Sequence, residues 1–304
     1  MTDALVLDDV CKSFGPVRAV DHLGVRVPTG CVYGFLGPNG AGKTTTLRMV
    51  MDIIRPDSGR IEVLGDGHRA GRQSRIGYMP EERGLYRKMT AAKVLTYFGQ
   101  IKGLSDRQVA DRVPKWLQRV GLGEAANRKV EDLSRGMHQK LQFAATCINE
   151  PELVILDEPF SGLDPVNLDA IEGIILAMRD QGRTIIFSTH VMHEAERLCD
   201  RILLINRGRP ILDGTLDEIR ARRSSRAVSV ELEGDADFVA ALPVVERVTR
   251  SGRAWDVTLA PEADPQQLLA ELVGRVKVLS FAVKVPSLHE IFVNLVGADS
   301  EQNS

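Results

Sequence analysis

The hydrophobic residues of this chain fall into short runs at two different spacings. Predominantly apolar runs, typical of strands that are buried on both faces of a parallel sheet, stand at 32–36, 153–156, 184–188 and 201–205. Segments with apolar residues at helical spacing occupy 45–51 and 165–179. Because strands alternate with helices across 150–205, the pattern predicts an α/β domain built on a mostly parallel sheet.

Nearer the N-terminus, short segments with partial alternation of apolar and polar residues predict a second kind of sheet. They occupy 4–7, 23–28 and 60–64, and turn residues such as Gly15-Pro16 separate them. We expect a small antiparallel sheet that flanks the first one. A further strand is expected at 76–80, where Pro80 ends it.

The segment from about 88 to 150 is predicted to be a helical subdomain inserted into the α/β domain. Its apolar residues have helical spacing at 93–99, 106–120 and 138–148. Ser105 precedes the second of these helices, and Gln108 three residues later completes a capping box. We place the whole first domain at 1–219.

A change of composition near residue 220 indicates a domain boundary. A polar, basic linker is predicted at 220–226, where arginines surround Ser224-Ser225; contact with anionic lipid headgroups is the alternative. A small α+β domain follows at 227–297, with strands at 227–233, 254–260 and 277–285 and helices at 265–273 and 287–295. The polar residues 298–304 are expected to form a frayed tail.

Composition narrows the class of protein. The chain has 304 residues, of which 43% are hydrophobic and 26% charged, as in ordinary soluble proteins. The formal net charge of -2 argues against nucleic acid as a partner. No apolar run approaches the roughly 18 residues of a membrane span, and the acidic N-terminal segment does not resemble a signal peptide. The four cysteines are widely spaced, which predicts buried free thiols in a reducing compartment.

A glycine-rich segment between the strand at 32–36 and the helix that follows fits the pattern G-x-x-x-x-G-K-S/T. It comprises Gly37, Pro38, Asn39, Gly40, Ala41, Gly42, Lys43, Thr44 and Thr45. Such a loop turns successive backbone N–H groups toward one anion, beside the positive end of the helix dipole. Lys43 supplies a charge for the β- and γ-phosphates, and the Thr44 hydroxyl can ligate Mg²⁺. The sequence therefore predicts a nucleoside triphosphate site in a phosphate-loop NTPase core.

Two acidic residues follow the apolar run at 153–156. Asp157 is placed to hold Mg²⁺ opposite Thr44, and Glu158 to polarise an attacking water, because parallel sheets bind ligands at their carboxyl ends. His190 and His193 could share a helix face, but nothing nearby supplies the further ligands of a metal site.

Two other residues have an ordinary and a functional interpretation. Phe14 lies in the turn between the first two strands, where an adenine ring could stack on it; a residue that covers the core is the commoner case. Ser134 is a natural N-cap for the helix that follows, and the same helix end could instead meet a phosphate.

Over residues 3–215 the chain resembles the ATP-binding subunits of ABC transporters. The resemblance rests on the order of five motifs, namely the phosphate loop at 37–45, the signature at 133–137, the acidic strand at 153–158, the turn at 161–164, and His190. It implies that Phe14 stacks on adenine and that His190 contacts the γ-phosphate. It also implies that Asp164 bridges two subunits, and that Ser134 and Gly136 complete the ATP site of the opposite subunit.

Two positions depart from that family's pattern. In the signature, usually Leu-Ser-Gly-Gly-Gln, Arg135 replaces the first glycine and Met137 the glutamine, while Ser134 and Gly136 are retained. Glu81 stands where the family has glutamine; its carboxylate can ligate Mg²⁺ but, when ionised, donates no hydrogen bond. The loop at 80–86 and the C-terminal domain resemble type-two exporters of the sodium- and drug-exporting kind.

The resemblance implies an ATPase with ATP and Mg²⁺ as cofactors. Glu158, His190 and Lys43 are its expected catalytic residues, and Thr44, Asp157 and Glu81 its expected Mg²⁺ ligands. Two subunits, as a homodimer or a heterodimer, would close around ATP and drive a separate membrane permease from the cytoplasmic face of the cell membrane. The alternatives are a soluble ABC ATPase without a transport role and an ATP-dependent regulatory protein.

Overall fold

A six-stranded sheet organises the first part of the chain. In the computed structural model its strand order is β5-β6-β7-β3-β8-β9. The strands are Ile76–Met79, Leu153–Asp157, Thr184–Thr189, Val32–Leu36, Arg201–Asn206 and Arg209–Gly214, in that spatial order. All neighbours are parallel except β8 and β9. The parallel α/β core predicted from the apolar runs is thereby confirmed, and β9 is an edge strand that the sequence patterns did not reveal.

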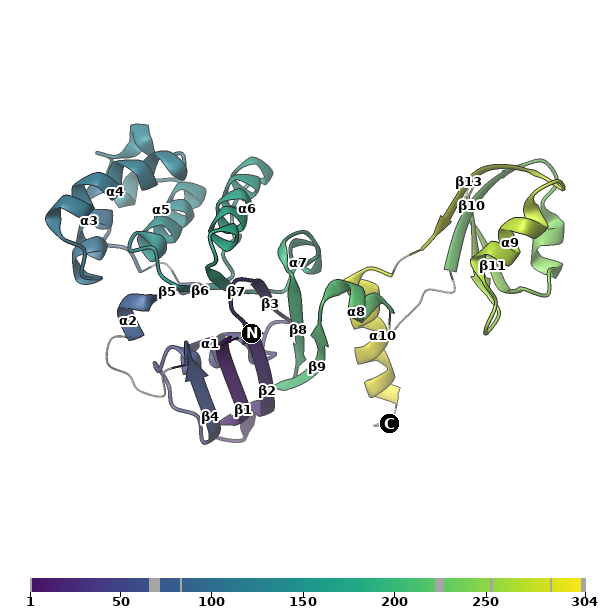
Figure 1. Cartoon of the computed structure of the whole chain (residues 1–304), viewed down its shortest axis with the longest axis horizontal. Coiled ribbons are helices and arrows are strands. Elements are labelled where there is room, and N and C mark those ends of the chain that lie inside the picture. The colour runs from purple at the N-terminus through teal and green to yellow at the C-terminus, as the bar shows by residue number, and fades with distance from the viewer. Residues whose placement is uncertain are drawn as a thin grey trace. The chain divides into compact units, whose positions relative to one another are not determined.

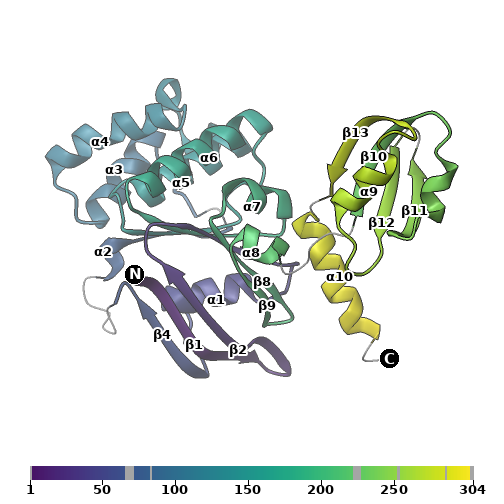
Figure 2. The same cartoon turned by 45° about the vertical axis from the view of Figure 1, so that its right-hand side comes forward.

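The structure describes residues 2–65, 72–82, 84–221, 227–251, 254–284 and 286–301. It divides the chain into two units, Met1–Leu216 and Asp217–Ser304. Each unit is described by itself (Figures 1 and 2).

The predicted antiparallel sheet is present, in the order β2-β1-β4. Its strands are Asp3–Phe14, Val17–Pro28 and Ser58–Val63. The first two are much longer than expected, because register shifts such as the one between Leu7 and Val10 interrupt the alternation without ending the pairing. Phe14 ends β1 with 51% of its surface exposed, so the interpretation of Phe14 as a residue covering the core is wrong. Buried residues of both sheets form one hydrophobic core.

Helices surround the central sheet (Figure 2). Helix α1, Lys43–Val50, begins two residues earlier than predicted, directly after the glycine-rich loop; the others are α2, Arg72–Arg75, α6, Pro165–Asp180, and α7, Met192–Leu198. His190 precedes α7 whereas His193 lies within it, so the two do not share a helix face as the spacing suggested. No helix among the described residues is long and apolar enough to cross a membrane.

The inserted block contains the three predicted helices, α3, Ala91–Ile101, α4, Asp106–Arg119, and α5, Arg135–Cys147, with short 3-10 turns at Gly123–Ala125 and Val130–Asp132. The predicted capping box of Ser105 and Gln108 is present at the start of α4. Trp116 of α4 and Phe143 of α5 pack edge to face in its interior. The block places the N-terminus of α5 close to the turn that follows β6, because Gly136 lies near Gly162 and Leu163.

The second unit contains a four-stranded antiparallel sheet in the order β11-β12-β10-β13. Its elements are β10, Ala227–Glu233, a 3-10 turn at Asp237–Ala241, β11, Val245–Ser251, β12, Ala254–Leu259, α9, Pro265–Leu272, β13, Lys277–Val283, and α10, Leu288–Glu301. Strand β11 was not predicted, because its residues are mostly polar. Of the predicted linker, Arg220 and Ala221 belong to helix α8, Leu216–Ala221, and 222–226 lie outside the described residues.

The four cysteines carry free thiols, and Cys11, Cys147 and Cys199 are buried while Cys31 is half-buried. Burial raises the pKa of Cys147 to about 12 and that of Cys31 to about 11. The thiols of Cys147 and Cys31 therefore stay protonated and unreactive at neutral pH.

Candidate active site

The glycine-rich loop from Gly37 to Thr45 connects β3 to α1 and encloses one side of a cavity of about 420 Å³. Gly42 caps α1 with a φ of 102°, and a Cβ there would lie 2.3 Å from the Ala19 carbonyl oxygen. Only glycine fits this position, because both the backbone conformation and the close approach exclude a side chain. Other lining residues come from outside the loop, namely Val17, Arg18, Ala19, Glu81 and Glu158.

The Lys43 side chain is buried beneath this loop. Its Nζ donates to the carbonyl oxygens of Gly37, at 2.8 Å, and Pro38, at 3.2 Å. Burial lowers the pKa of Lys43, and the nearby Glu158 carboxylate opposes that shift. A desolvated ammonium beneath a glycine-rich loop is a site for a polyanion, because an anionic ligand restores the charge balance that burial disturbs.

Asp157 ends β6 and is completely buried. Its Oδ1 accepts hydrogen bonds from the hydroxyls of Thr44, at 3.1 Å, and Ser188. Its Oδ2 is buried and has no hydrogen-bond partner among the described residues. A buried carboxylate oxygen left in this state is costly unless a cation or water meets it. With the Thr44 hydroxyl beside it, this set of oxygen atoms fits Mg²⁺.

Glu158 follows directly and has a positive φ of 49°. Its backbone N–H is 3.2 Å from both the backbone oxygen and the side-chain oxygen of Ser188 on β7. Its Oε1 lies 3.0 Å from His190 Nδ1 and 3.9 Å from Lys43 Nζ. The Glu158 side chain is only 11% exposed, so the carboxylate is held between a histidine and a lysine in a largely dry position.

The structure thus brings together five residues that the sequence singled out, at the carboxyl ends of β3, β6 and β7, which are Lys43, Thr44, Asp157, Glu158 and His190. Sequence reasoning missed Ser188, whose hydroxyl donates to Asp157 and contacts the Glu158 amide. A serine at the end of an apolar strand carries no pattern that distinguishes this role.

Glu81 lines the cavity from the loop after β5 and is exposed. Phe14 is not among the residues that line the cavity. Its partner in the pairing of β1 with β2 is Val17, which does line the cavity. The ring of Phe14 is exposed, and Lys12 Nζ is 5.6 Å from the ring centroid.

Three other singled-out residues lie outside the residues that line this cavity, namely Ser134, Gly136 and Asp164. Ser134 caps α5 by accepting from the Met137 amide at 3.3 Å. Asp164 caps α6 and accepts from the Asn167 amide at 2.9 Å, which holds the pKa of its carboxyl below the usual range. Both caps follow local rules of helix termini, and both side chains are exposed.

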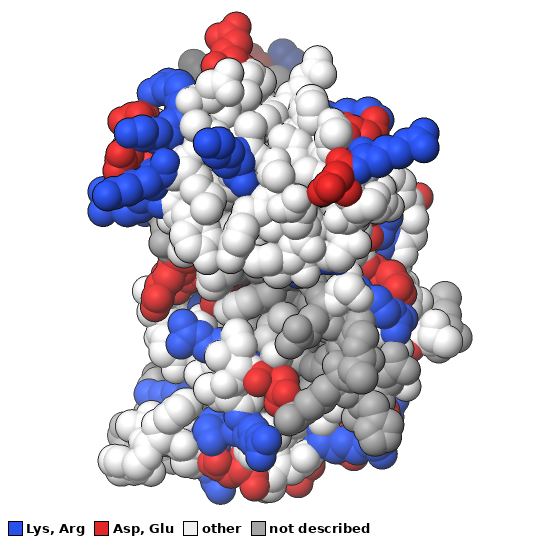
Figure 3. Space-filling model, turned by 90° about the vertical axis from the view of Figure 1, so that its left-hand side faces the viewer, with Lys and Arg blue, Asp and Glu red and all other residues white. Residues whose placement is uncertain are grey.

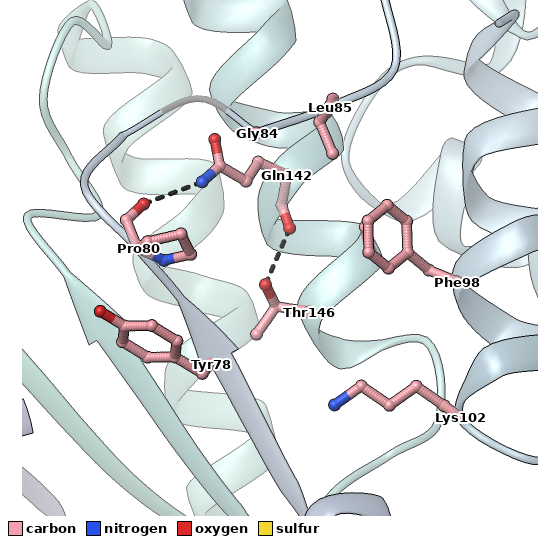
Figure 4. A pocket seen from close by; sticks show the side chains of 9 residues that line it. Tyr78, Pro80, Gly84, Leu85, Phe98, Lys102, Gln142 and Thr146 are labelled. Atoms are coloured by element: carbon pink, nitrogen blue, oxygen red, sulfur yellow. Dashed lines mark hydrogen bonds between the residues drawn. The ribbon is translucent and has the colours of Figure 1, made fainter. Parts of the chain in front are cut away.

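A second cavity, of about 220 Å³, lies between β5 and the helical block. Figure 4 shows Phe98 and Lys102 at the end of α3, and Gln142 and Thr146 on α5, around it. Gln142 Nε2 donates to the carbonyl oxygens of Pro80, at 2.8 Å, and Glu82, at 3.2 Å, and thereby ties α5 to the loop that carries Glu81. Phe98 and Lys102 are four residues apart, as are Gln142 and Thr146, and this spacing is the sequence feature that could have indicated a shared helix face.

Acidic and basic side chains lie near one another on one face of the molecule. Figure 3 shows them in separate groups around broad uncharged areas, and the described residues of this face form no continuous basic stripe of the kind that tracks a nucleic-acid backbone.

Two parts of the sequence match known families. Residues 20–161 match the family described as "ABC transporter", and residues 214–296 match the one described as "ATP-binding protein DrrA1-3-like, C-terminal domain". The second match covers most of the C-terminal unit, for which the sequence had offered no catalytic residues.

Similar proteins are matched over nearly their whole length. An uncharacterised ABC transporter ATP-binding protein of Bacillus subtilis, YhaQ, is 37% identical over 97% of this chain and 99% of the relative. The Nod factor export ATP-binding protein I of a Rhizobium species is 36% identical over 98% and 99% of the two chains. The daunorubicin resistance ATP-binding protein DrrA3 of Streptomyces coeruleorubidus is 33% identical over 97% and 96%. A solved structure of an ATP-binding subunit of an ABC transporter superposes with a TM-score of 0.68 at 30% identity, over 72% of this chain and 93% of that one.

Proposed function

Because this chain belongs to the family of ABC transporter ATP-binding subunits, which are ATPases, we propose that it hydrolyses ATP to drive an exporter. Subunits of this family work with membrane permeases. The observation that carries the proposal is the placement of the Glu158 carboxylate, 3.0 Å from His190 and 3.9 Å from Lys43, at the mouth of the phosphate loop.

The phosphate loop binds the triphosphate in this proposal. Backbone N–H groups of 39–45 and the Lys43 ammonium meet the β- and γ-phosphates. Thr44 and Asp157 would hold Mg²⁺, and Glu81 would supply a further oxygen ligand. When bound, Mg²⁺ neutralises charge on the phosphate oxygens. The exposed ring of Phe14 stacks on adenine.

Glu158 and His190 carry out the chemical step. The Glu158 carboxylate accepts a proton from the water that attacks the γ-phosphorus, while the bond from that phosphorus to the β–γ bridging oxygen breaks and ADP leaves. The backbone of Glu158, fixed directly after β6, holds the carboxylate in place. His190, whose Nδ1 contacts Glu158, presents its exposed edge to the γ-phosphate. The imidazole thereby orients the base and senses whether the phosphate is present.

Dimerisation completes each site. Ser134 and Gly136 lie outside the cavity of their own chain, so they are available to meet the ATP held by a second subunit, and Asp164 lies beside that boundary. Driving such a clamp from mostly open to mostly closed takes about 5.5 kcal/mol of differential binding. Four or more charge-assisted hydrogen bonds, at about 1.5–3 kcal/mol each, cover that requirement.

The permease is a separate chain, and the protein is held by it at the cytoplasmic face of the membrane. Relatives named for Nod factor export and daunorubicin resistance support an exporter. A permease helix docks at the second cavity, where Leu85 and the exposed Tyr86 border the loop that carries Glu81. Gln142 connects this loop to α5, so docking and the ATP site share one element.

Two experiments test the proposal. The purified chain hydrolyses ATP with Mg²⁺, and Lys43→Ala abolishes turnover; equal rates for both would refute the assignment of the site. A tagged chain isolated from detergent-solubilised membranes carries a polytopic membrane protein with it. Recovery of ribosomes or DNA in its place would indicate a soluble ABC ATPase, and binding of ATP without turnover would indicate a regulatory protein.

A further inference from the structure

Three side chains on the first two turns of α5 reach the segment that follows β6. Gln139 Nε2 donates to the Pro159 carbonyl oxygen at 2.9 Å, and Lys140 Nζ to Asn167 Oδ1 at 2.9 Å. Arg135 Nη2 donates to Ser161 Oγ at 3.3 Å. The same helix end therefore carries the signature residues and holds the turn that begins at Glu158.

Arg135 lies flat against this turn. Gly162 has a φ of 81°, and a Cβ built there would lie 2.3 Å from Nε and 2.9 Å from Cδ of Arg135. The backbone conformation of the turn favours a glycine here, and the arginine side chain occupies the space beside it. Packing of the guanidinium group and its hydrogen bond act on two neighbouring residues, Gly162 and Ser161.

The turn is short and is anchored at both ends. At its start, the Glu158 amide is fixed to Ser188 on β7. At its end, Asp164 caps α6. Inside the turn, the Ser161 amide donates to the Glu158 oxygen at 3.3 Å and the Leu163 amide to the Phe160 oxygen at 3.1 Å. A displacement of α5 that pulls on Ser161 is therefore transmitted to Glu158 through one bonded turn.

We propose that Arg135 is a positioning residue that couples the signature end of α5 to Glu158 of the same chain. The inference rests on the proposed function, in which Ser134 and Gly136 meet the ATP of the second subunit. Occupancy of that distant site then draws α5 inward, and Arg135 carries the movement to the base of the chain's own site. Arginine at a signature position that is usually glycine thus adds a contact through which occupancy of one site affects hydrolysis at the other.

Steady-state ATPase kinetics test the link in the full-length chain. Arg135→Ala lowers kcat about tenfold, the range of one charge-assisted hydrogen bond, leaves KM for ATP within about twofold, and lowers the Hill coefficient toward one. Ser161→Ala also lowers kcat. The double variant has the same kcat as Arg135→Ala, because both substitutions remove the same interaction. Arg107→Ala, an exposed arginine on α4, is the charge-matched control and keeps parental kinetics.

Hydrogen exchange in the nucleotide-free chain tests the link without turnover. Arg135→Ala speeds exchange at the Ser161 and Leu163 amides, and Arg107→Ala does not. Absence of ATPase activity in the parent would refute the proposed function, while exchange would still report on the contact. The inference is overturned by unchanged exchange and kcat in Arg135→Ala. A second set of results also overturns it, in which Arg135→Ala raises KM for ATP, Arg135→Lys returns KM to the parental value, and Ser161→Ala changes neither kcat nor KM. Arg135 would then act only as a positive charge for the phosphate of the opposite site.

Discussion

His190 Nδ1 lies 3.0 Å from Oε1 of Glu158, although 32 residues separate the two along the chain. Strands β6 and β7 are parallel neighbours, so the residues after their carboxyl ends come together. The contact places the imidazole where it can orient the carboxylate, while 52% of the histidine side chain remains exposed for a ligand.

The first prediction concerns this pair. His190→Ala should lower kcat by about 100-fold or more, the range for loss of a group that acts with a general base. ATP binding should persist, because Lys43 and the loop amides are untouched. Equilibrium binding of a fluorescent ATP analogue and a phosphate-release assay measure the two quantities. His193→Ala, one turn away on the exposed side of α7, is the control and should behave as the parent.

The second prediction concerns Glu158. Glu158→Gln keeps the shape of the side chain and removes the base, so turnover should fall by about 100-fold or more. An ATP-loaded dimer should then accumulate, detectable by light scattering coupled to size-exclusion chromatography. Hydrolysis at the parental rate in this variant would show that Glu158 is not the base. A strictly monomeric variant in saturating ATP and Mg²⁺ would contradict the dimer clamp.

The third prediction concerns Mg²⁺. Asp157→Asn should raise the Mg²⁺ concentration needed for half-maximal ATPase activity about tenfold or more, because it replaces an anionic carboxylate by a neutral amide, whose nitrogen cannot bind a cation. The buried Oδ2 of Asp157 has no hydrogen-bond partner among the described residues, so its negative charge is available to a cation. A Mg²⁺ titration measures the shift. The control is Asp111→Asn, because Asp111 forms an exposed ion pair with Lys115. If Asp157→Asn gave the same titration curve as the parent, Asp157 would not be a Mg²⁺ ligand.

The fourth prediction concerns the permease. Tyr86→Ala removes an exposed ring whose hydroxyl lies 3.1 Å from that of Tyr97, and Leu85→Ala removes an apolar side chain from the second cavity. Both should weaken co-purification of the permease and its stimulation of ATP hydrolysis, with unstimulated hydrolysis retained in Tyr86→Ala. Val166→Ala, an exposed apolar residue on α6, is the control. Docking at this cavity is wrong if both variants bind the permease as the parent does.

The fifth prediction concerns pH and stability. Burial raises the pKa of Glu194, which accepts a hydrogen bond from Thr189. The folded chain then holds this proton more tightly than the unfolded chain. Stability is therefore greatest below the unfolded pKa and falls as pH rises through the folded pKa. Glu194→Gln should raise Tm at pH 7 by about 1–2 °C.

That gain should shrink as pH falls toward 4.5, the ordinary pKa of a glutamate. Thermal unfolding followed by circular dichroism at several pH values measures it. Glu124→Gln, an exposed acid in the helical block, should leave Tm unchanged. If Glu194→Gln raised Tm by the same amount at every pH, the cause would be altered packing and not the titration of Glu194.

The sequence by itself determined the phosphate loop, the buried strands and their α/β class, because these depend on local spacing. Gly37 to Thr45 fits its pattern position by position, and the predominantly apolar runs at β3, β6 and β7 indicate strands that are buried on both faces. The caps at Ser105 and Ser134 also follow from residues within one turn of each other. Long strands were underestimated, since bulges in β1 disturb the alternation while hydrogen bonds to β2 continue.

Only the tertiary structure decided which of these residues meet. Ser188 contacts Asp157 and Glu158 because β6 and β7 are neighbours in the sheet. The residues of the two strands do not by themselves predict that order. Arg135 packs on Gly162 because the helical block folds back over the turn after β6. The local sequence pattern determines the conformation of a helix, strand or turn, because that conformation depends on residues close together in the chain. Contacts across 26 or more residues, such as that of Arg135 with Ser161, depend on how the layers pack.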